Sequence, residues 1–303
     1  MEVTSRPPLT RVRSLKIVHG VCPEIEVAED FEAKRTLVAR WARGSAAGCM
    51  NHPEWMNNPQ FILSCPEPGP VGISLTQILT AGEPPATMGA YFFDARAFYG
   101  YQLGNKAAPF LAKLAFVNLE TISATLNITT PGDYLMIPCT FEPGVERHFA
   151  LDVDEGQATF AHARPWSVGT LPCQWTSQYS GGSMNCRTWV QNPTFHLTIS
   201  GSEPCSVTLA VFVKERLDTR IGGYIFEDVK GDGVPTVFGI RANIPFVSGH
   251  GAVITLPALP PKQYIIMPCT EASNKLGTCY IGIPESPTKE RCALKGPFFP
   301  SRR

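Results

Sequence analysis

The sequence predicts an all-β protein made of two tandem antiparallel β-sandwich domains. Three observations predict this fold: a block of sequence recurs, short segments alternate between apolar and polar residues, and turn residues separate those segments. With 26 glycines and 28 prolines among 303 residues, helices of ordinary length have little room. Many short strands with Gly/Pro punctuation are typical of a β-sandwich.

The internal repeat is clearest in a block of seventeen residues that returns 134 positions later. Residues 47–63 and 181–197 share eight identical positions, including Asn58 and Asn192. Two shorter blocks, GAYFFD/GGYIFE and YLMIPCT/YIIMPCT, follow in the same order at nearly the same offset. Three ordered blocks indicate two homologous folding units.

The strands of each unit are expected from period-two alternation. Phe195, Leu197 and Ile199 alternate with His196 and Thr198, which puts one face inward and the other outward. By the same pattern, the phenylalanines of the repeated block are expected to face the core.

The repeat and the length together suggest where the domains begin and end. We expect a leader or a first strand over residues 1–35, one sandwich over residues 36–154 and a second, more divergent one over residues 155–303. Residues 31–43 are the best helical candidate but suit equally a strand that enters the first domain.

Composition narrows the function and the location. The chain has 26 basic and 26 acidic residues, so a net charge of zero gives no reason to expect a nucleic-acid partner. No apolar run is long enough for a membrane helix, and the N-terminus lacks the apolar core of a secretory signal. We therefore expect the ten cysteines to be thiols and the location to be intracellular, in the cytoplasm.

Two long motifs resemble a known family. Residues 40–63 read RWARGSAAGCMNHPEWMNNPQFIL, and residues 131–151 read PGDYLMIPCTFEPGVERHFAL. They resemble the opening and the closing hairpin of the calpain-type β-sandwich, the C2-like domain III that follows the protease core in calpains, although Cys139 stands where that family usually has serine. The second copy keeps the Asn-Pro and Pro-Cys-Thr motifs and lacks the Phe-Glu-Pro-Gly continuation. The tandem arrangement resembles the C-terminal half of PalB-type calpains.

Catalytic residues are not expected in this chain. A calpain-type protease needs a cysteine nucleophile, a histidine base and an asparagine that orients it. No cysteine here is followed by tryptophan, and none of the six histidines matches a partner motif. Cys139 and Cys269, at equivalent places in the two copies, are expected to be packing residues.

Candidate binding residues are few. Calcium requires six to eight oxygen ligands, and the weak candidates are the acidic loop residues Asp152, Asp154, Asp228 and Asp232, for which a solvated loop is the alternative. Arg11 and Arg13, with the nearby Arg6 and Lys16, form a basic cluster that is either a solvated leader or a contact with an anionic surface. For Trp55 and Trp189, packing in the core or at its rim competes with a partner contact.

The expected function is therefore binding without catalysis. The chain would bind and position a protease core, a protein partner or a membrane surface. Three alternatives remain: a fragment of a calpain-like cysteine protease whose catalytic core lies outside this chain, a stand-alone adaptor, and a calcium-dependent phospholipid-binding C2-like module. No cofactor is expected apart from possible Ca²⁺.

Overall fold

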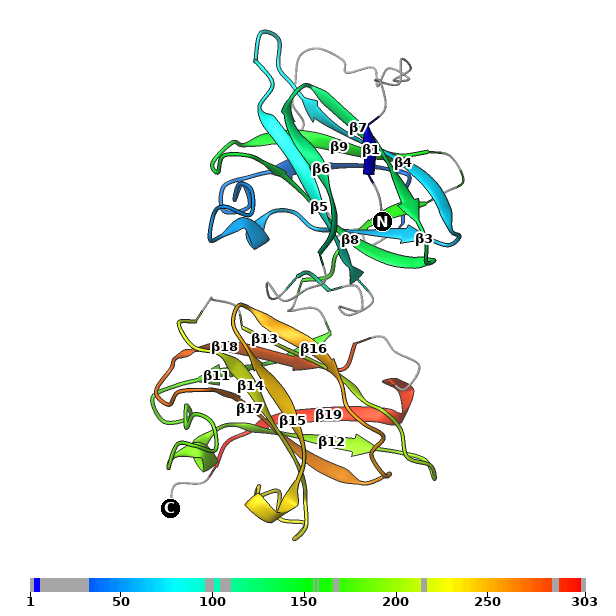
Figure 1. Ribbon diagram of the computed structural model, residues 1–303. Helices are drawn as coiled ribbons and strands as arrows, with labels where there is room; N and C mark the ends of the chain where they lie inside the picture. The colour runs from blue at the N-terminus through cyan, green and yellow to red at the C-terminus, as the bar shows by residue number, and fades with distance from the viewer. Residues whose placement is uncertain are drawn as a thin grey trace. The chain divides into compact units, whose positions relative to one another are not determined.

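The chain folds into two compact units, each of which is a sandwich of two antiparallel sheets (Figure 1). Unit 1 comprises Met1–Arg96 and Ala108–Arg164, and unit 2 comprises Ala97–Ala107 and Pro165–Arg303. The computed structural model describes residues 3–5, 33–95, 101–103, 110–154, 156, 158–165, 169–213, 217–284 and 289–300.

In unit 1, the first sheet has the strand order β1-β7-β4-β9-β2 and the second has the order β10-β3-β8-β5-β6. The first sheet consists of β1 (Val3–Ser5), β7 (Thr121–Ile128), β4 (Gly69–Ile78), β9 (Arg147–Val153) and β2 (Thr36–Trp41). The second consists of β10 (Thr159–His162), β3 (Phe61–Cys65), β8 (Gly132–Thr140), β5 (Thr87–Asp94) and β6 (Phe110–Asn118).

In unit 2, the orders are β11-β18-β13-β16 and β15-β14-β17-β12-β19. The first sheet consists of β11 (Thr170–Trp175), β18 (Gly277–Gly282), β13 (Thr208–Val213) and β16 (Gly251–Thr255). The second consists of β15 (Ile240–Val247), β14 (Ile221–Glu227), β17 (Gln263–Thr270), β12 (Thr194–Ile199) and β19 (Cys292–Phe298).

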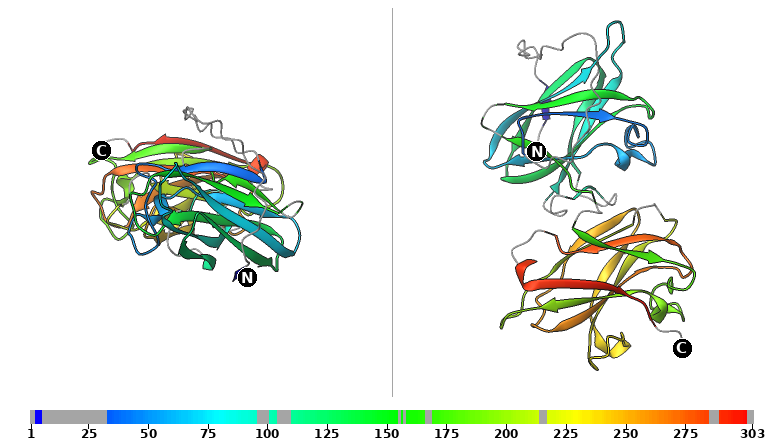
Figure 2. Two further views of the ribbon diagram at one scale, coloured as in Figure 1. Left: turned by 90° about the horizontal axis from the view of Figure 1, so that it is seen from above. Right: turned by 180° about the vertical axis from the view of Figure 1, so that it is seen from behind.

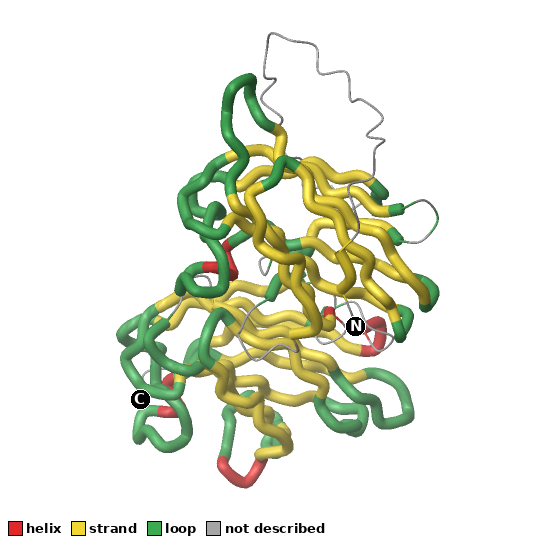
Figure 3. Tube along the Cα trace, turned by 45° about the horizontal axis from the view of Figure 1, so that its top comes forward, coloured by secondary structure: helices red, strands yellow, loops and turns green. Residues whose placement is uncertain are grey.

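The two units have one topology. When β3 is matched to β12, β5 to β14 and β8 to β17, the other strands of each second sheet fall in the same order, and the first sheets differ by the added β1. Strands dominate both units, and the described helical segments are short 3-10 turns: Trp55–Asn57, Trp189–Gln191, Val237–Gly239 and Lys289–Arg291 (Figures 2 and 3). The predicted all-β fold with antiparallel sandwiches is confirmed.

Side-chain alternation explains why these segments are strands. Along β2, Leu37, Ala39 and Trp41 are buried while the residues between them are exposed, so this part of the ambiguous segment 31–43 is a strand. Phe61 and Phe195 are both fully buried, as period two requires of the inward face.

Unit 1 ends at Arg164, ten residues after the boundary expected at Asp154, because a further strand pairs with it. β10 pairs antiparallel with β3, and Lys34 forms an isolated bridge with Phe160 of β10. Because β10 completes the edge of the second sheet, the unit extends to Arg164.

Within unit 2, β13 is buried on both faces. One face carries Leu209 and Val211 into the core of the sandwich. On the other face, Phe212 packs against Tyr101, with ring centroids 5.8 Å apart, and Tyr101 is only 2% exposed. This second contact explains why β13 reads as a continuous apolar run rather than a clean alternation.

Across the described residues, no helix is long and apolar enough to cross a membrane.

Candidate binding pocket in the second sandwich

The repeated asparagine holds the same turn in both sandwiches. Asn192 accepts a hydrogen bond from the backbone N–H of Gly181 (3.0 Å) and donates to the carbonyls of Gly182 (2.7 Å) and Trp189 (2.8 Å). Asn58 makes the corresponding three bonds at 3.2, 2.8 and 2.7 Å. Both side chains are buried, so this amide satisfies backbone groups that would otherwise be left unpaired.

A glycine and a tyrosine support that turn. Gly48 and Gly182 have φ of 74° and 78°, and a Cβ on Gly182 would lie 2.7 Å from the backbone nitrogen of Ser273. The hydroxyl of Tyr224 accepts the backbone N–H of Met184 at 3.2 Å, and in unit 1 the Tyr91 hydroxyl does the same for Met50 at 3.1 Å. The repeated residues are therefore scaffold.

The repeated tryptophans are also packing residues in this structure. Trp55 stacks on Phe93, and Trp189 stacks on Phe226, each with ring centroids 5.8 Å apart and planes at 24°. Trp55 is 1% exposed, so it offers a partner no surface, whereas Trp189 is half-buried.

Backbone hydrogen bonds show which residues correspond across this turn. In unit 1 the N–H of Cys49 donates to the carbonyl of Phe141 at 3.2 Å, and in unit 2 Ser183 donates to Glu271 at 3.2 Å. Cys49 therefore corresponds to Ser183, and Phe141 to Glu271, a change from an aromatic to a charged side chain.

The residue whose carbonyl accepts the backbone N–H at this position also differs between the two units: it is Thr87 in unit 1 and Arg220 in unit 2. The N–H of Phe141 donates to the carbonyl of Thr87 at 2.7 Å, and the N–H of Glu271 donates to that of Arg220 at 2.8 Å. The unit 2 side chains form a bidentate ion pair, in which Arg220 Nε lies 2.7 Å from Glu271 Oε2 and the second contact joins Nη2 to Oε1. One uncharged contact in unit 1 has thus become an ion pair in unit 2.

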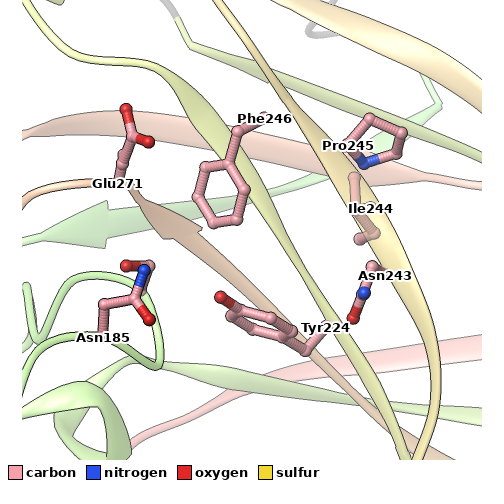
Figure 4. A pocket seen from close by; sticks show the side chains of 8 residues that line it. Asn185, Tyr224, Asn243, Ile244, Pro245, Phe246 and Glu271 are labelled. Carbon is pink, nitrogen blue, oxygen red and sulfur yellow. The ribbon is translucent and has the colours of Figure 1, made fainter.

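This exchange is accompanied by a pocket. In unit 1, Phe141 packs edge-on against Phe116 (5.9 Å), which in turn lies 5.5 Å from Tyr91. In unit 2 the Tyr224–Phe246 contact is kept at 5.9 Å, but the acidic Glu271 takes the place of the third ring. A cavity of about 330 Å³ lies here, lined by Ser183, Asn185, Tyr224, Asn243, Ile244, Pro245, Phe246 and Glu271 (Figure 4).

The lining is aromatic with polar groups at several points. Figure 4 shows Asn185 and Asn243 on either side of the Tyr224 ring, with Glu271 beyond Phe246. Ser183 is 2% exposed, and its Oγ lies near the Tyr224 hydroxyl without the geometry of a hydrogen bond. Burial raises the pKa of Tyr224, so its hydroxyl keeps its proton at neutral pH.

The charge of Glu271 is compensated at the pocket wall. Hydrogen bonding to Arg220 lowers the pKa of Glu271 below its ordinary value, and the same contact raises that of Arg220. Both groups also line a neighbouring hollow of about 590 Å³, together with Leu217, Asp218, Thr219, Ser248 and Gly249. Neither lining includes a histidine or a cysteine, so the described pocket has the residues for binding and lacks the usual acid–base or thiol groups.

The acidic candidates of unit 1 have local partners. Asp152 accepts a hydrogen bond from the Thr36 hydroxyl. The carboxylate of Asp154 lies against Gly72: a Cβ on residue 72 would be 2.0 Å from Asp154 Oδ2. These contacts place the two carboxylates beside β2 and β4 of unit 1.

The acidic candidates of unit 2 belong to the loop after β14. Asp228 accepts the backbone N–H of Gly233 at 3.1 Å through Oδ2, while its buried Oδ1 has no hydrogen-bond partner, and Asp232 accepts that of Val234 at 3.0 Å. Within the described part of the chain, no three His, Cys, Asp or Glu side chains gather as a metal ion would require.

The other candidates can be placed briefly. Arg11 and Arg13, with Arg6 and Lys16, lie outside the described residues. Cys139 and Cys269 are fully buried, and burial raises the pKa of both thiols well above the usual range. Both are inert core thiols of the kind that packing alone explains.

The pocket in unit 2 was not predicted from the sequence. One sequence difference marks it: the repeated block reads PCTF at residues 138–141 and PCTE at residues 268–271, so Phe141 is replaced by Glu271 directly after three identical residues. A second missed pair is Trp41 and Trp175, also 134 residues apart, which donate through Nε1 to the carbonyls of Pro138 (3.0 Å) and Pro268 (3.3 Å).

Comparison with known proteins places the first sandwich in a family. Residues 37–153 match the model of the calpain large subunit, domain III. A calpain-like cysteine protease A of Dictyostelium discoideum is 24% identical over 188 residues, 59% of this chain and 28% of that protein. A calpain of Schistosoma mansoni is 26% identical over 161 residues, 46% of this chain and 21% of that protein.

A further relative has a different name. A Dictyostelium discoideum protein named serine/threonine-protein kinase 4 homolog B is 30% identical over 273 residues, which are 79% of this chain and 24% of that protein. The chain thus spans about a quarter of the length of each of these relatives. The tandem arrangement of PalB-type calpains stays a prediction. The family match, the fold and the residues of the opening and closing motifs agree, and residues 37–153 form a calpain-type, C2-like β-sandwich of the domain III family.

Proposed function

We propose that this chain is a non-catalytic accessory module that binds another protein and positions it, with a calpain-type protease core as the first candidate. The observation that carries the proposal is the difference between two copies of one scaffold. Unit 2 keeps the asparagine, glycine and tyrosine that hold the turn, yet has an open pocket where unit 1 packs the Phe141 ring.

The relatives support an accessory role. Proteins that share this region are named for two different activities, protein kinase and cysteine protease. A single shared region does not account for both phosphoryl transfer and peptide hydrolysis, and domain III is a non-catalytic part of calpains. A portable binding domain accounts for its presence in both kinds of protein.

The charge and the thiols fit this role. The net charge of zero favours a protein partner over nucleic acid or an anionic membrane. The nine described cysteines are free thiols, most of them buried, which suits an intracellular, reducing compartment such as the cytoplasm. Exposed apolar side chains on the β14–β15 loop, such as Phe238 at 89%, add surface that a partner could cover.

A direct binding experiment tests the proposal. The purified chain is titrated into the catalytic core of a calpain by isothermal titration calorimetry, and in parallel it is sedimented with anionic liposomes with and without calcium. The expected result is saturable binding to the core and no calcium-dependent pelleting. Pelleting that disappears when Asp228 and Asp232 are changed to asparagine, without binding to the core, would favour the phospholipid alternative instead.

A further inference from the structure

We propose that the pocket of unit 2 binds an uncharged, extended peptide segment that lies along β15 and inserts one side chain against the rings of Tyr224 and Phe246. This inference rests on the proposed function, since it gives the partner protein a chemical character and a point of attachment. It assigns a site to the second sandwich that the domain III match, which covers residues 37–153, does not reach.

The position of β15 favours a peptide. β15 is the end strand of its sheet and pairs with β14 on one side, so its other side presents backbone N–H and C=O groups. Four consecutive residues of β15, residues 243–246, line the pocket. An extended segment can add to such an edge by main-chain hydrogen bonds while an alternate side chain enters a pocket. Pro245 has no N–H to donate, which limits the added ladder to a few bonds.

The size of the pocket sets the size of the insert. A volume of about 330 Å³ lies at the lower end for ligand pockets. It suits one side chain with its flanking backbone rather than a cofactor. The Tyr224 and Phe246 rings meet at 61°, which gives the insert apolar walls.

The electrostatics argue for an uncharged insert. The only charged side chain in the described lining is Glu271, and Arg220 already neutralises it through two contacts. A charged group entering the pocket would lose hydration without gaining a free counter-charge. A neutral side chain avoids that cost.

The polar lining matches groups that both donate and accept. Asn185 and Asn243 each offer an amide, and the buried Ser183 Oγ makes no hydrogen bond within the described structure. A peptide backbone, or an inserted amide or hydroxyl side chain, provides complementary donors and acceptors. Bonding to Ser183 would also satisfy a buried polar atom.

The test replaces two residues of the unit 2 pocket by the residues that unit 1 has at the corresponding positions. The double variant Glu271→Phe with Arg220→Thr reproduces the residues that unit 1 has at these two positions. The fold is expected to tolerate it, because unit 1 holds Phe141 and Thr87 in the same backbone hydrogen bond. Leu276→Ser, an exposed change on the same sandwich that lies outside both described linings, is the matched control.

The experiment uses the full chain and a display library of random linear peptides. Selected peptides are measured by fluorescence anisotropy against the wild type and each variant, with circular dichroism as the check of folding. We expect enrichment of peptides with a common uncharged residue and a loss of affinity of about tenfold or more in the double variant. Ser183→Ala is expected to weaken binding about two- to tenfold, the range for one hydrogen bond, and Leu276→Ser to leave it unchanged.

Two results would overturn the inference. One is no enrichment, and the other is enriched peptides whose affinity survives the double variant in a folded protein. Enriched peptides that share a charged residue would contradict the uncharged insert. None of these results affects the titration with the protease core, so the pocket can fail while the accessory function stands.

Discussion

Removing the Asn192 side chain should destabilise the second unit more than its size suggests. Asn192→Ala deletes three hydrogen bonds, to Gly181, Gly182 and Trp189, at a fully buried position. At about 1 kcal/mol net for each bond, the free energy of unfolding should fall by about 3 kcal/mol, and by more if the orphaned backbone groups stay dry. With a urea slope of about 2 kcal/mol per molar, the midpoint shifts by about 1.5 M.

The assay is equilibrium urea denaturation, with hydrogen exchange of β12 peptides to assign the transition to unit 2. Gln191→Ala, an exposed change one residue away, is the control and should leave the midpoint in place. A shift for Asn192→Ala below about 0.2 M corresponds to about 0.4 kcal/mol, less than one hydrogen bond contributes, and would refute the reasoning that this amide holds the turn.

The remaining predictions concern the cores, one ion pair and one exposed ring. Phe61→Ala and Phe195→Ala should each cost about 3 to 5 kcal/mol in the unfolding free energy, because both rings are fully buried, and an unmoved urea midpoint would contradict this. Hydrogen bonding to Lys262 lowers the pKa of Glu227 from 4.5, so the stabilisation is present above that value and is lost as the pH falls through the folded pKa. Lys262→Met should therefore lower the melting temperature at neutral pH and have less effect in strong acid, and an equal effect in both would count against the pair. Phe238→Ser should leave the melting temperature unchanged, because 89% of that side chain is already exposed.

Repeated scaffold residues were the part of the structure that the sequence could predict. Asn58 and Asn192 stand out because each accepts one bond and donates two, and the smaller hydroxyl of serine has only one hydrogen to donate. Phe61 and Phe195 were assigned to the inward face from alternation alone, and both are fully buried.

Other features depended on contacts that periodicity does not encode. The sequence of residues 31–43 suits a helix and a strand equally. Pairing of β2 with β9 makes residues 36–41 a strand, in which Leu37, Ala39 and Trp41 face the core. The burial of β13 on both faces requires Tyr101, which is more than a hundred residues away in the sequence. Pairing of β10 with β3 moves the end of unit 1 to Arg164 for the same reason.

The pocket was missed for a more instructive reason. The residues that the two copies share, such as Asn58 and Asn192, hold the scaffold. The pocket lies where the copies differ, at Phe141 and Glu271, and its meaning became visible only when backbone hydrogen bonds aligned the two positions. Differences between internal repeats that are embedded in conserved turns are therefore worth inspecting as candidate binding sites.

Peptide hydrolysis by the purified chain is the decisive measurement, because we propose that this β-sandwich module binds a partner without catalysing a reaction. The chain is incubated with fluorogenic peptides with and without calcium, beside an intact calpain as the positive control. No turnover is expected in either condition, because seven of the nine described cysteines are buried and the described pocket lining contains no histidine or cysteine. Turnover that disappears when a single cysteine is changed to alanine would contradict it.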